Sequence, residues 1–146
     1  MTRGVELCNP GNLERDPKVA WLGQLGTQTD PRFVGVINPL FGFRALALVL
    51  LHYVERDGCA ATVREIVTRY EGGKANPDHN NIPAYILFVS QQIGFDPDAT
   101  LELRLEHPTV GNDLPALMWA MSLQEIGDSG WRDQIVGALY AAAGQL

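Results

Sequence analysis

Residues 38–55, with the sequence NPLFGFRALALVLLHYVE, decide the fold that we expect for this chain. Asn38 can cap a helix with its side chain, and Pro39 suits the first helical position. Large apolar side chains then recur at spacings of three or four residues: Phe43, Leu46, Leu50 and Tyr53. Because the middle of this segment is apolar most of the way round, it predicts a central core helix that ends near Asp57-Gly58.

Four further helices are expected downstream of this one. They are expected at about residues 62–70, 81–93, 114–126 and 131–143. Polar residues mark three of their starts: Thr62 with Glu65 in a capping box, Asn80 or Asn81, and Asp113. A polar loop over 71–80 and a connector over 95–111, with a short extended piece at 101–105, separate them. The chain is therefore predicted to be mainly α, with about five helices.

The first 38 residues lack this periodicity and predict irregular structure. Asn9-Pro10-Gly11-Asn12 is a turn sequence, because Pro fixes φ and Gly accepts positive φ. Residues 21–26 and 32–37 are joined by a polar, turn-prone bridge, which predicts a small β-hairpin. A lone hairpin is marginal in water, so it must pack on the helices. At 146 residues we expect one domain, 1–146, with an irregular or hairpin segment (1–38) and a helical core (39–146).

Composition excludes several function classes. The chain has 11 Lys and Arg against 17 Asp and Glu, for a net charge of -6, which argues against binding to nucleic acid. The longest apolar run, residues 45–51, is too short to span a membrane. Two cysteines make no disulfide framework, and no signal peptide is apparent. The three histidines lack metal-ligand spacing and no glycine loop suits a phosphate, so neither a metal nor a cofactor is expected.

The order of motifs along the chain resembles a family of small proteins from tailed bacteriophages and prophages that are described as virion structural proteins. The resemblance covers most of the chain and rests on these segments: Arg3-Gly4, Asn9-Pro10-Gly11-Asn12-Leu13, Trp21-Leu22-Gly23-Gln24, Phe33-Val34, Gly42-Phe43-Arg44-Ala45-Leu46, Tyr53, Thr62-Val63-Arg64-Glu65-Ile66, Asn80-Asn81-Ile82-Pro83-Ala84-Tyr85 and Gln124-Glu125-Ile126-Gly127. The sequence departs from the family pattern at polar positions: Leu7 and Cys8 replace asparagines, Tyr70-Glu71-Gly72 replaces Trp-Ala-Pro, and His79-Asn80-Asn81-Ile82 replaces Glu-Asn-Asp-Thr. Such departures suit a domain that kept its fold and lost an activity.

The resemblance implies a virion protein, made in the bacterial cytoplasm and held in the particle by contacts with other virion proteins. Exposed apolar residues of the last helix are the expected docking face: Trp131, Ile135 and Leu139. Some members of the family look similar to lysozymes. That likeness implies a lysozyme-like α+β fold and descent from a peptidoglycan hydrolase. The alternative is an active enzyme of the muramidase or lytic transglycosylase type, with peptidoglycan as its substrate.

Such an enzyme needs a carboxylic acid in a partly apolar pocket. Glu125 is the first candidate for the general acid, because it follows an apolar helix beside Met121 and Ile126, where burial favours the protonated carboxyl group. Glu6, just before the NPGN turn, is the second. For both residues, a solvated position at the surface is the alternative. Glu71 and Asp78 are interpreted as solvated loop charges.

Residues that could bind a glycan lie at the N-terminal end of the chain: Asn9, Asn12, Trp21, Gln24 and Arg44. The two asparagine amides could bind the acetamido groups of an amino sugar, or they could close the turn. Trp21 and Gln24 could line a sugar groove, or Trp21 could anchor the hairpin. Arg44 could instead pair with a carboxylate such as that of Glu6, or bond carbonyl groups of the NPGN turn.

Overall fold

A computed structural model describes residues 2–72 and 81–144 of the chain. It contains these helices: α1 (Arg3–Glu6), α2 (Pro39–Glu55), α3 (Val63–Gly72), α4 (Ile82–Ile93), α5 (Leu114–Ile126) and α6 (Gln134–Ala142). The prediction of a mainly α fold is confirmed, and α1 is a short helix that the sequence did not suggest. Asp78, His79 and Asn80 lie outside the described residues.

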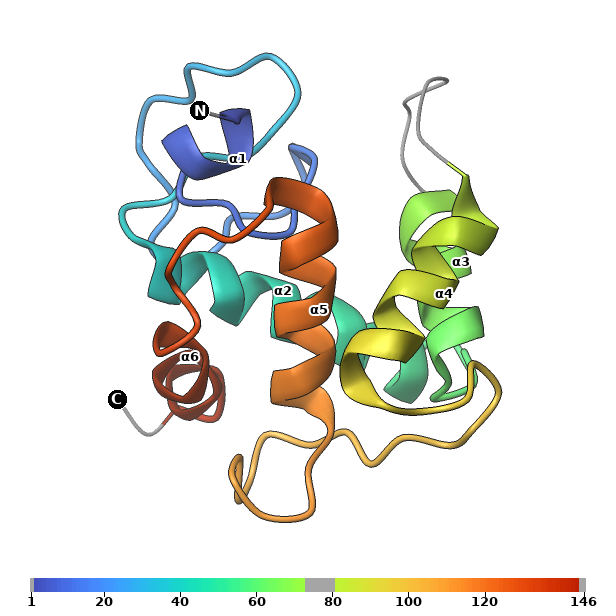
Figure 1. Cartoon of the computed structure of the whole chain (residues 1–146). Coiled ribbons are helices and arrows are strands. Elements are labelled where there is room, and N and C mark those ends of the chain that lie inside the picture. Colours follow the sequence, from blue (N-terminus) through green and yellow to red (C-terminus); the bar gives the residue numbers. More distant parts are fainter. Residues whose placement is uncertain (1, 73–80, 145–146) are drawn as a thin grey trace.

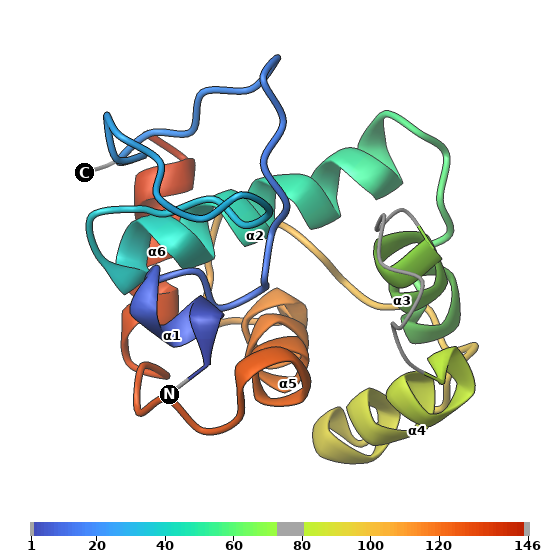
Figure 2. The same ribbon diagram turned by 90° about the horizontal axis from the view of Figure 1, so that it is seen from above.

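Helix α2 forms the centre of the molecule. It crosses the fold behind α5, with α6 against one end and the α3–α4 pair beyond the other (Figures 1 and 2). Leu46 and Leu50 on α2 are fully buried. The central core helix is thus where the sequence placed it, because a helix that is apolar on nearly all sides needs neighbours on nearly all sides.

Side chains cap most of the predicted helix starts. Asn38 Oδ1 accepts a hydrogen bond from the amide of Phe41 at 3.2 Å, and Asn81 Oδ1 accepts one from the amide of Ala84 at 3.1 Å. Thr62 Oγ1 accepts from the amide of Glu65 at 3.2 Å. These bonds satisfy amides that have no partner within the helix.

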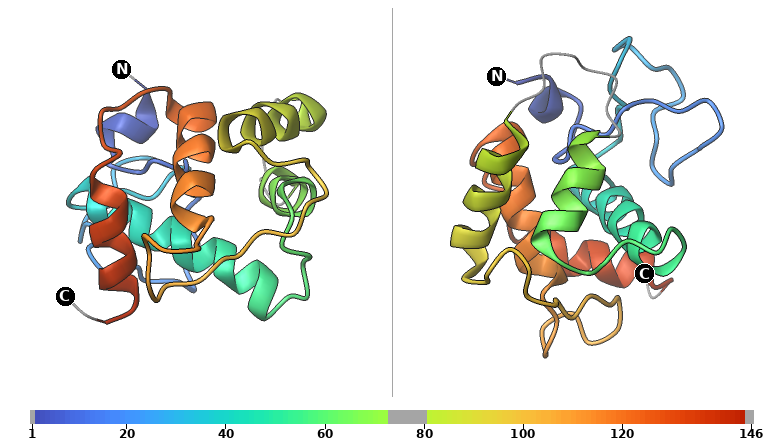
Figure 3. Two further views of the ribbon diagram at one scale, coloured as in Figure 1. Left: turned by 60° about the horizontal axis from the view of Figure 1, so that its bottom comes forward. Right: turned by 90° about the vertical axis from the view of Figure 1, so that its right-hand side faces the viewer.

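The predicted cap of α5 is wrong in detail. Asp113 makes no capping bond with its side chain; its carboxylate accepts instead from the amide of Glu102 at 2.8 Å. Asn112 provides a side-chain bond at the helix start instead, because its Oδ1 accepts from the amide of Leu114 at 3.0 Å. Asp113 thereby ties the start of α5 to the connector that reaches it from α4 along the base of the molecule (Figure 3).

The predicted β-hairpin is also wrong, since residues 2–38 contain no strand. They form two isolated antiparallel bridges, Glu14 with Phe33 and Gln24 with Val36. Gln28 explains why no ladder grows from the second bridge. The amide of Leu25 donates to the carbonyl of Gly35 at 3.0 Å, but the return bond is replaced by Gln28. Its side chain accepts from the amide of Gly35 at 2.8 Å and donates to the carbonyl of Leu25 at 2.8 Å.

The predicted docking face on the last helix is not exposed. Ile135 and Leu139 are buried, and Trp131 lies before α6 and packs against the core. Helix α6 crosses the first part of α2 and packs against it, and its buried apolar side chains lie in the core. The apolar stripe on this last helix therefore marks the face that packs against the core, not a docking surface.

Candidate functional site

The NPGN turn is packed tightly against α1, α2 and α3. A Cβ atom on Gly42 of α2 would lie 2.5 Å from the ring of Pro10 and closer still to the carbonyl oxygen of Cys8. A Cβ on Gly11 would lie 2.6 Å from the hydroxyl of Tyr70. The turn therefore rests on helices through positions where only glycine fits.

Asn9 holds the turn together from inside. Its Nδ2 donates to the carbonyls of Leu13 and Val34, both at 2.9 Å, and its Oδ1 accepts from the amide of Leu13 at 2.9 Å. Only 1% of the residue is exposed. Both Nδ2 hydrogens are bonded to backbone carbonyls of this chain. Asn9 therefore closes the turn, which is the structural alternative given for it above.

Asn12 and Glu125, which the sequence singled out separately, are in direct contact. Asn12 Nδ2 donates to Glu125 Oε1 at 3.2 Å and to the backbone carbonyl of Glu125 at 3.1 Å. Tyr85 on α4 donates its hydroxyl hydrogen to Glu125 Oε2 at 2.9 Å. Each carboxylate oxygen of Glu125 thus accepts a bond from a different element, and the residue is half-buried.

Two tyrosines complete this cluster, which we call the Glu125 junction and define as Asn12, Tyr70, Tyr85 and Glu125. Tyr70 on α3 donates its hydroxyl hydrogen to the carbonyl of Gly11. Burial, and secondly the negative charge of Glu125, raise the pKa of both tyrosines well above the usual range. Their hydroxyls therefore keep their hydrogens and act as donors at any ordinary pH.

Glu71 belongs to the surroundings of this junction, contrary to the prediction of a solvated loop charge. It lies in the last turn of α3 and is 3% exposed. Its charge also contributes to the raised pKa of Tyr70 and Tyr85. The pattern predicts a helix end near Tyr70, which places Glu71 in the polar loop, whereas α3 continues to Gly72.

Other predicted site residues lie elsewhere. Glu6 is exposed at the end of α1, and Gln24 Oε1 accepts from the amide of Trp21 at 3.1 Å, which closes a local turn. The Nε atom of Arg44 is buried, and within 2–72 and 81–144 it has no hydrogen-bond partner. Among the described residues, no bond joins Arg44 to Glu6 or to the turn carbonyls, the structural alternative for this side chain.

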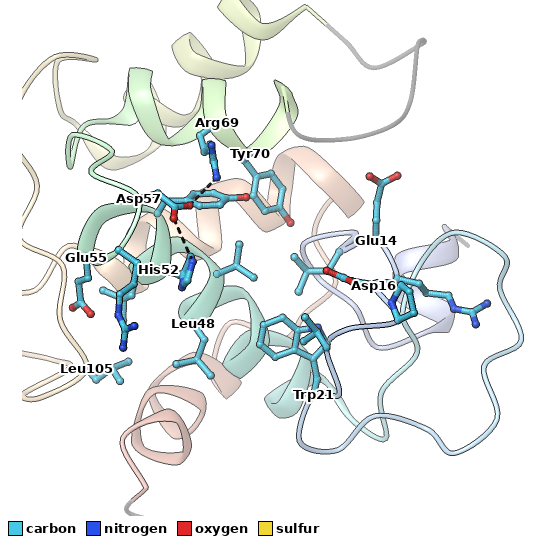
Figure 4. Close-up of a pocket in the computed structure, with 18 of the residues that line it drawn as sticks. Glu14, Asp16, Trp21, Leu48, His52, Glu55, Asp57, Arg69, Tyr70 and Leu105 are labelled. Atoms are coloured by element: carbon cyan, nitrogen blue, oxygen red, sulfur yellow. Dashed lines mark hydrogen bonds and ion pairs between the residues drawn. The ribbon is translucent and has the colours of Figure 1, made fainter.

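Trp21 lines a separate open groove of about 940 Å³. We call it the α2 groove; it runs between residues 13–21 of the N-terminal segment and the second half of α2, with α3 and residues 105–106 beside it. Figure 4 shows Glu14, Asp16 and Trp21 on one side and His52, Asp57 and Arg69 on the other. Glu125 does not line this groove; Tyr70 is the residue shared with the junction.

Paired charges fix the far wall of the α2 groove. Arg69 bonds Asp57 at 2.7 Å, and His52 Nε2 lies 3.4 Å from the same carboxylate. The guanidinium of Arg69 also lies 5.2 Å from the centre of the Tyr53 ring. Burial, opposed by Arg69 and assisted by Asp57, raises the pKa of Tyr53 to about 12, so this hydroxyl is a neutral part of the wall.

Comparison with known proteins shows no relationship for this chain: no protein-family model and no curated protein sequence matches it. In the part of the chain that the structure describes, no three His, Cys, Asp or Glu side chains gather in a way that could hold a metal ion. Among the helices of that part, none combines the length and apolar character needed to cross a membrane.

Proposed function

We propose that this chain is a virion-associated protein of a tailed bacteriophage or prophage, held by contacts with other virion proteins and descended from a lysozyme-like peptidoglycan hydrolase. The supporting observation is that motifs carrying the family resemblance depend on one another. A Cβ on Gly4 would lie 2.5 Å from Ile126 and closer still to Asn12 Oδ1. Asn12 in turn bonds Glu125, 113 residues away. Three segments that carry the resemblance, which contain Gly4, Asn12 and Glu125, thus pack against one another.

The hydrogen bonds of Glu125 support a structural role. Both carboxylate oxygens accept hydrogen bonds, from Asn12 and Tyr85. Charge-assisted bonds of this kind are stronger than neutral ones, so Glu125 cross-links the NPGN turn, α4 and α5. A catalytic carboxyl group has become, on this proposal, part of the framework of the domain.

Mass spectrometry of purified virions tests the proposal. Particles are induced from a strain that carries the gene, banded on a density gradient and digested with protease. We expect peptides of this chain at an abundance comparable with other particle proteins, and host cytosolic proteins serve as the contamination control. Particles that contain DNA but none of this chain would show that it is not a virion protein.

The second candidate is an active peptidoglycan-cleaving enzyme, a muramidase or lytic transglycosylase with Glu125 as general acid. It is favoured by the same carboxyl group, which is half-buried and fixed in orientation by Asn12 and Tyr85. Fixed orientation is what a proton donor to a glycosidic oxygen requires. A lytic transglycosylase needs one such acid, so the role does not depend on a second carboxylate.

Zymography on purified cell walls decides between the two candidates. An enzyme should clear the substrate as wild type and lose roughly 100-fold or more of its activity as Glu125→Gln. Glu102→Gln, which changes an exposed carboxylate on the connector, is the matched control and should keep full activity. No activity in either protein removes the enzymatic candidate, and equal activity in wild type and Glu125→Gln removes Glu125 as its general acid.

A further inference from the structure

We propose that the α2 groove binds a segment of another virion protein in which apolar side chains are flanked by lysine or arginine. This inference rests on the proposed function and names the place and the partner of the protein–protein contact. With the last helix buried against α2, the contact needs a different surface. The α2 groove, at about 940 Å³, is large enough for several side chains of an inserted segment.

The walls and floor of the groove are largely aliphatic and aromatic. The apolar residues that line it without being buried in the core are these: Val19, Trp21, Leu48, Val49, Tyr53 and Leu105. They come from the N-terminal segment, α2 and the connector, so an occupant would touch three separate parts of the chain. Covering such a surface removes apolar area from water, which is the main source of affinity in protein association.

The charge of the groove selects a cationic occupant. Five carboxylates and three guanidinium groups line it, in a chain with a net charge of -6. Arg69 is paired with Asp57, and Glu14 is paired with Arg32, which lies outside the groove. Arg15 donates to the neutral carbonyl of Asp30 and keeps its charge.

The carboxylates that remain for a partner are those of Asp16, Glu55 and Glu106, all exposed. Within the described ranges their side chains make no ion pair. Arg15 and Arg56 are the two cations that oppose these three carboxylates. Lysine or arginine at the edges of the occupant would meet a complementary field, and complementary charge sets the orientation and speed of docking.

A peptide suits these walls better than a glycan does. Val19, Leu48 and Val49 make only apolar contacts, and the charged side chains around them would meet opposite charges on a peptide but none on a neutral glycan. Neither of the carboxylates with a candidate role in glycan cleavage, Glu125 and Glu6, lines the groove.

Charge reversal at the edge of the groove tests the inference. A phage or prophage lacking the gene is complemented with wild type, with Glu55→Lys/Glu106→Lys, or with the control Glu65→Lys/Glu102→Lys, which makes the same charge change at exposed sites outside the groove. Copies per virion are measured by quantitative mass spectrometry, and thermal melting shows whether each variant is folded. We expect roughly a tenfold or greater loss of incorporation for the groove variant, because like charges now face each other, and less than about a twofold change for the control.

A photo-crosslinking residue at Val19, compared with one at the exposed Leu87 of α4, identifies the occupant inside the virion. A crosslink from position 19 to a segment rich in Lys or Arg supports the inference. An acidic or uncharged segment, or a groove variant that is folded and incorporated like wild type, overturns it. Binding of chitohexaose that is lost in Trp21→Ala, with normal incorporation of the groove variant, assigns the groove to a glycan instead. If wild type itself is missing from virions, the proposed function fails, and this inference fails with it.

Discussion

The N-terminal segment, residues 2–38, and the helical part, residues 39–144, are held together by different means. In the helical part, fully buried side chains such as Leu46, Leu50 and Leu117 fill one core. In the N-terminal segment, polar side chains bond the backbone of distant residues, as Asn9 does to Val34 and Gln28 to Gly35. The first arrangement tolerates exchange among apolar residues of similar volume, whereas the second depends on particular residues at particular positions.

Glycine marks the boundary between the two parts. Gly42 belongs to α2, yet it is the turn of the N-terminal segment that approaches it, through Cys8 and Pro10. The irregular N-terminal segment is therefore an integral part of the fold. It docks on the helices through contacts at which a single added methyl group has no space.

The largest effect is expected from truncation in the helical core. Leu50→Ala removes a fully buried side chain from the centre of α2 and should lower the free energy of unfolding by about 4 kcal/mol, through lost transfer energy and a cavity. Leu87→Ala, at a residue that is 55% exposed on α4, should change it by less than about 0.5 kcal/mol. Chemical denaturation measures both, and similar values would contradict a core centred on α2.

The next effect tests the boundary itself. Gly42→Ala places a methyl group against the carbonyl of Cys8 and the ring of Pro10. Because both neighbours are fixed parts of the backbone or a ring, we expect a loss of about 3 kcal/mol. Gly26→Ala adds the same group where no atom lies within 4 Å, and it should be neutral within about 0.5 kcal/mol. Equal melting temperatures for the two variants would show that the turn does not dock on α2.

A smaller effect is expected from the bond that joins the turn to α3. Tyr70→Phe keeps the ring and removes the hydroxyl that donates to the carbonyl of Gly11. A buried carbonyl without a donor costs about 2 kcal/mol. Tyr140→Phe, at a tyrosine that is 39% exposed on α6, serves as the control and should leave stability unchanged. Protection of amides in the N-terminal segment against hydrogen exchange should fall only in the Tyr70 variant.

The sequence predicts the helical part well, because each helix carries its own periodicity and its own end signals. Asn38 and Asn81 cap where expected, and Gly94 ends α4 with φ of 75°. The predicted hairpin fails at Leu25 and Gly35 because the side chain of Gln28 takes one of the two backbone hydrogen bonds that a ladder would form there. Alternation of apolar residues says nothing about such a competitor.

The candidate site is predicted only in part, and for a related reason. Asn12 and Glu125 are both recognisable in the sequence, but their contact spans 113 residues, and that of Tyr85 with Glu125 spans 40. Glu71 is buried although it adjoins a polar segment in the sequence. Local patterns report the surroundings of a residue within its own element, not the neighbours that folding brings.

The smallest effect concerns an ion pair in the N-terminal segment and is a dependence on pH. Arg3 bonds both carboxylate oxygens of Asp30 at 2.9 Å, and Asp30 also accepts from the amides of Phe33 and Arg32 at 2.8 Å. Chiefly the bond from Arg3, then that from Phe33, hold the pKa of Asp30 well below its usual range.

Because the pKa of Asp30 is lower in the folded than in the unfolded chain, this carboxylate stabilises the fold above pH of about 4, and that stability is lost as the pH falls further. Asp30→Asn should therefore show a shallower fall in melting temperature between pH of about 4 and 2 than wild type. Arg3→Gln should be intermediate, because the two amide donors remain. The effect is modest since the side chain of Arg3 is half exposed and water screens the pair. Three parallel melting curves across this window would show that the N-terminal segment does not rely on Asp30 in the way its hydrogen bonds indicate.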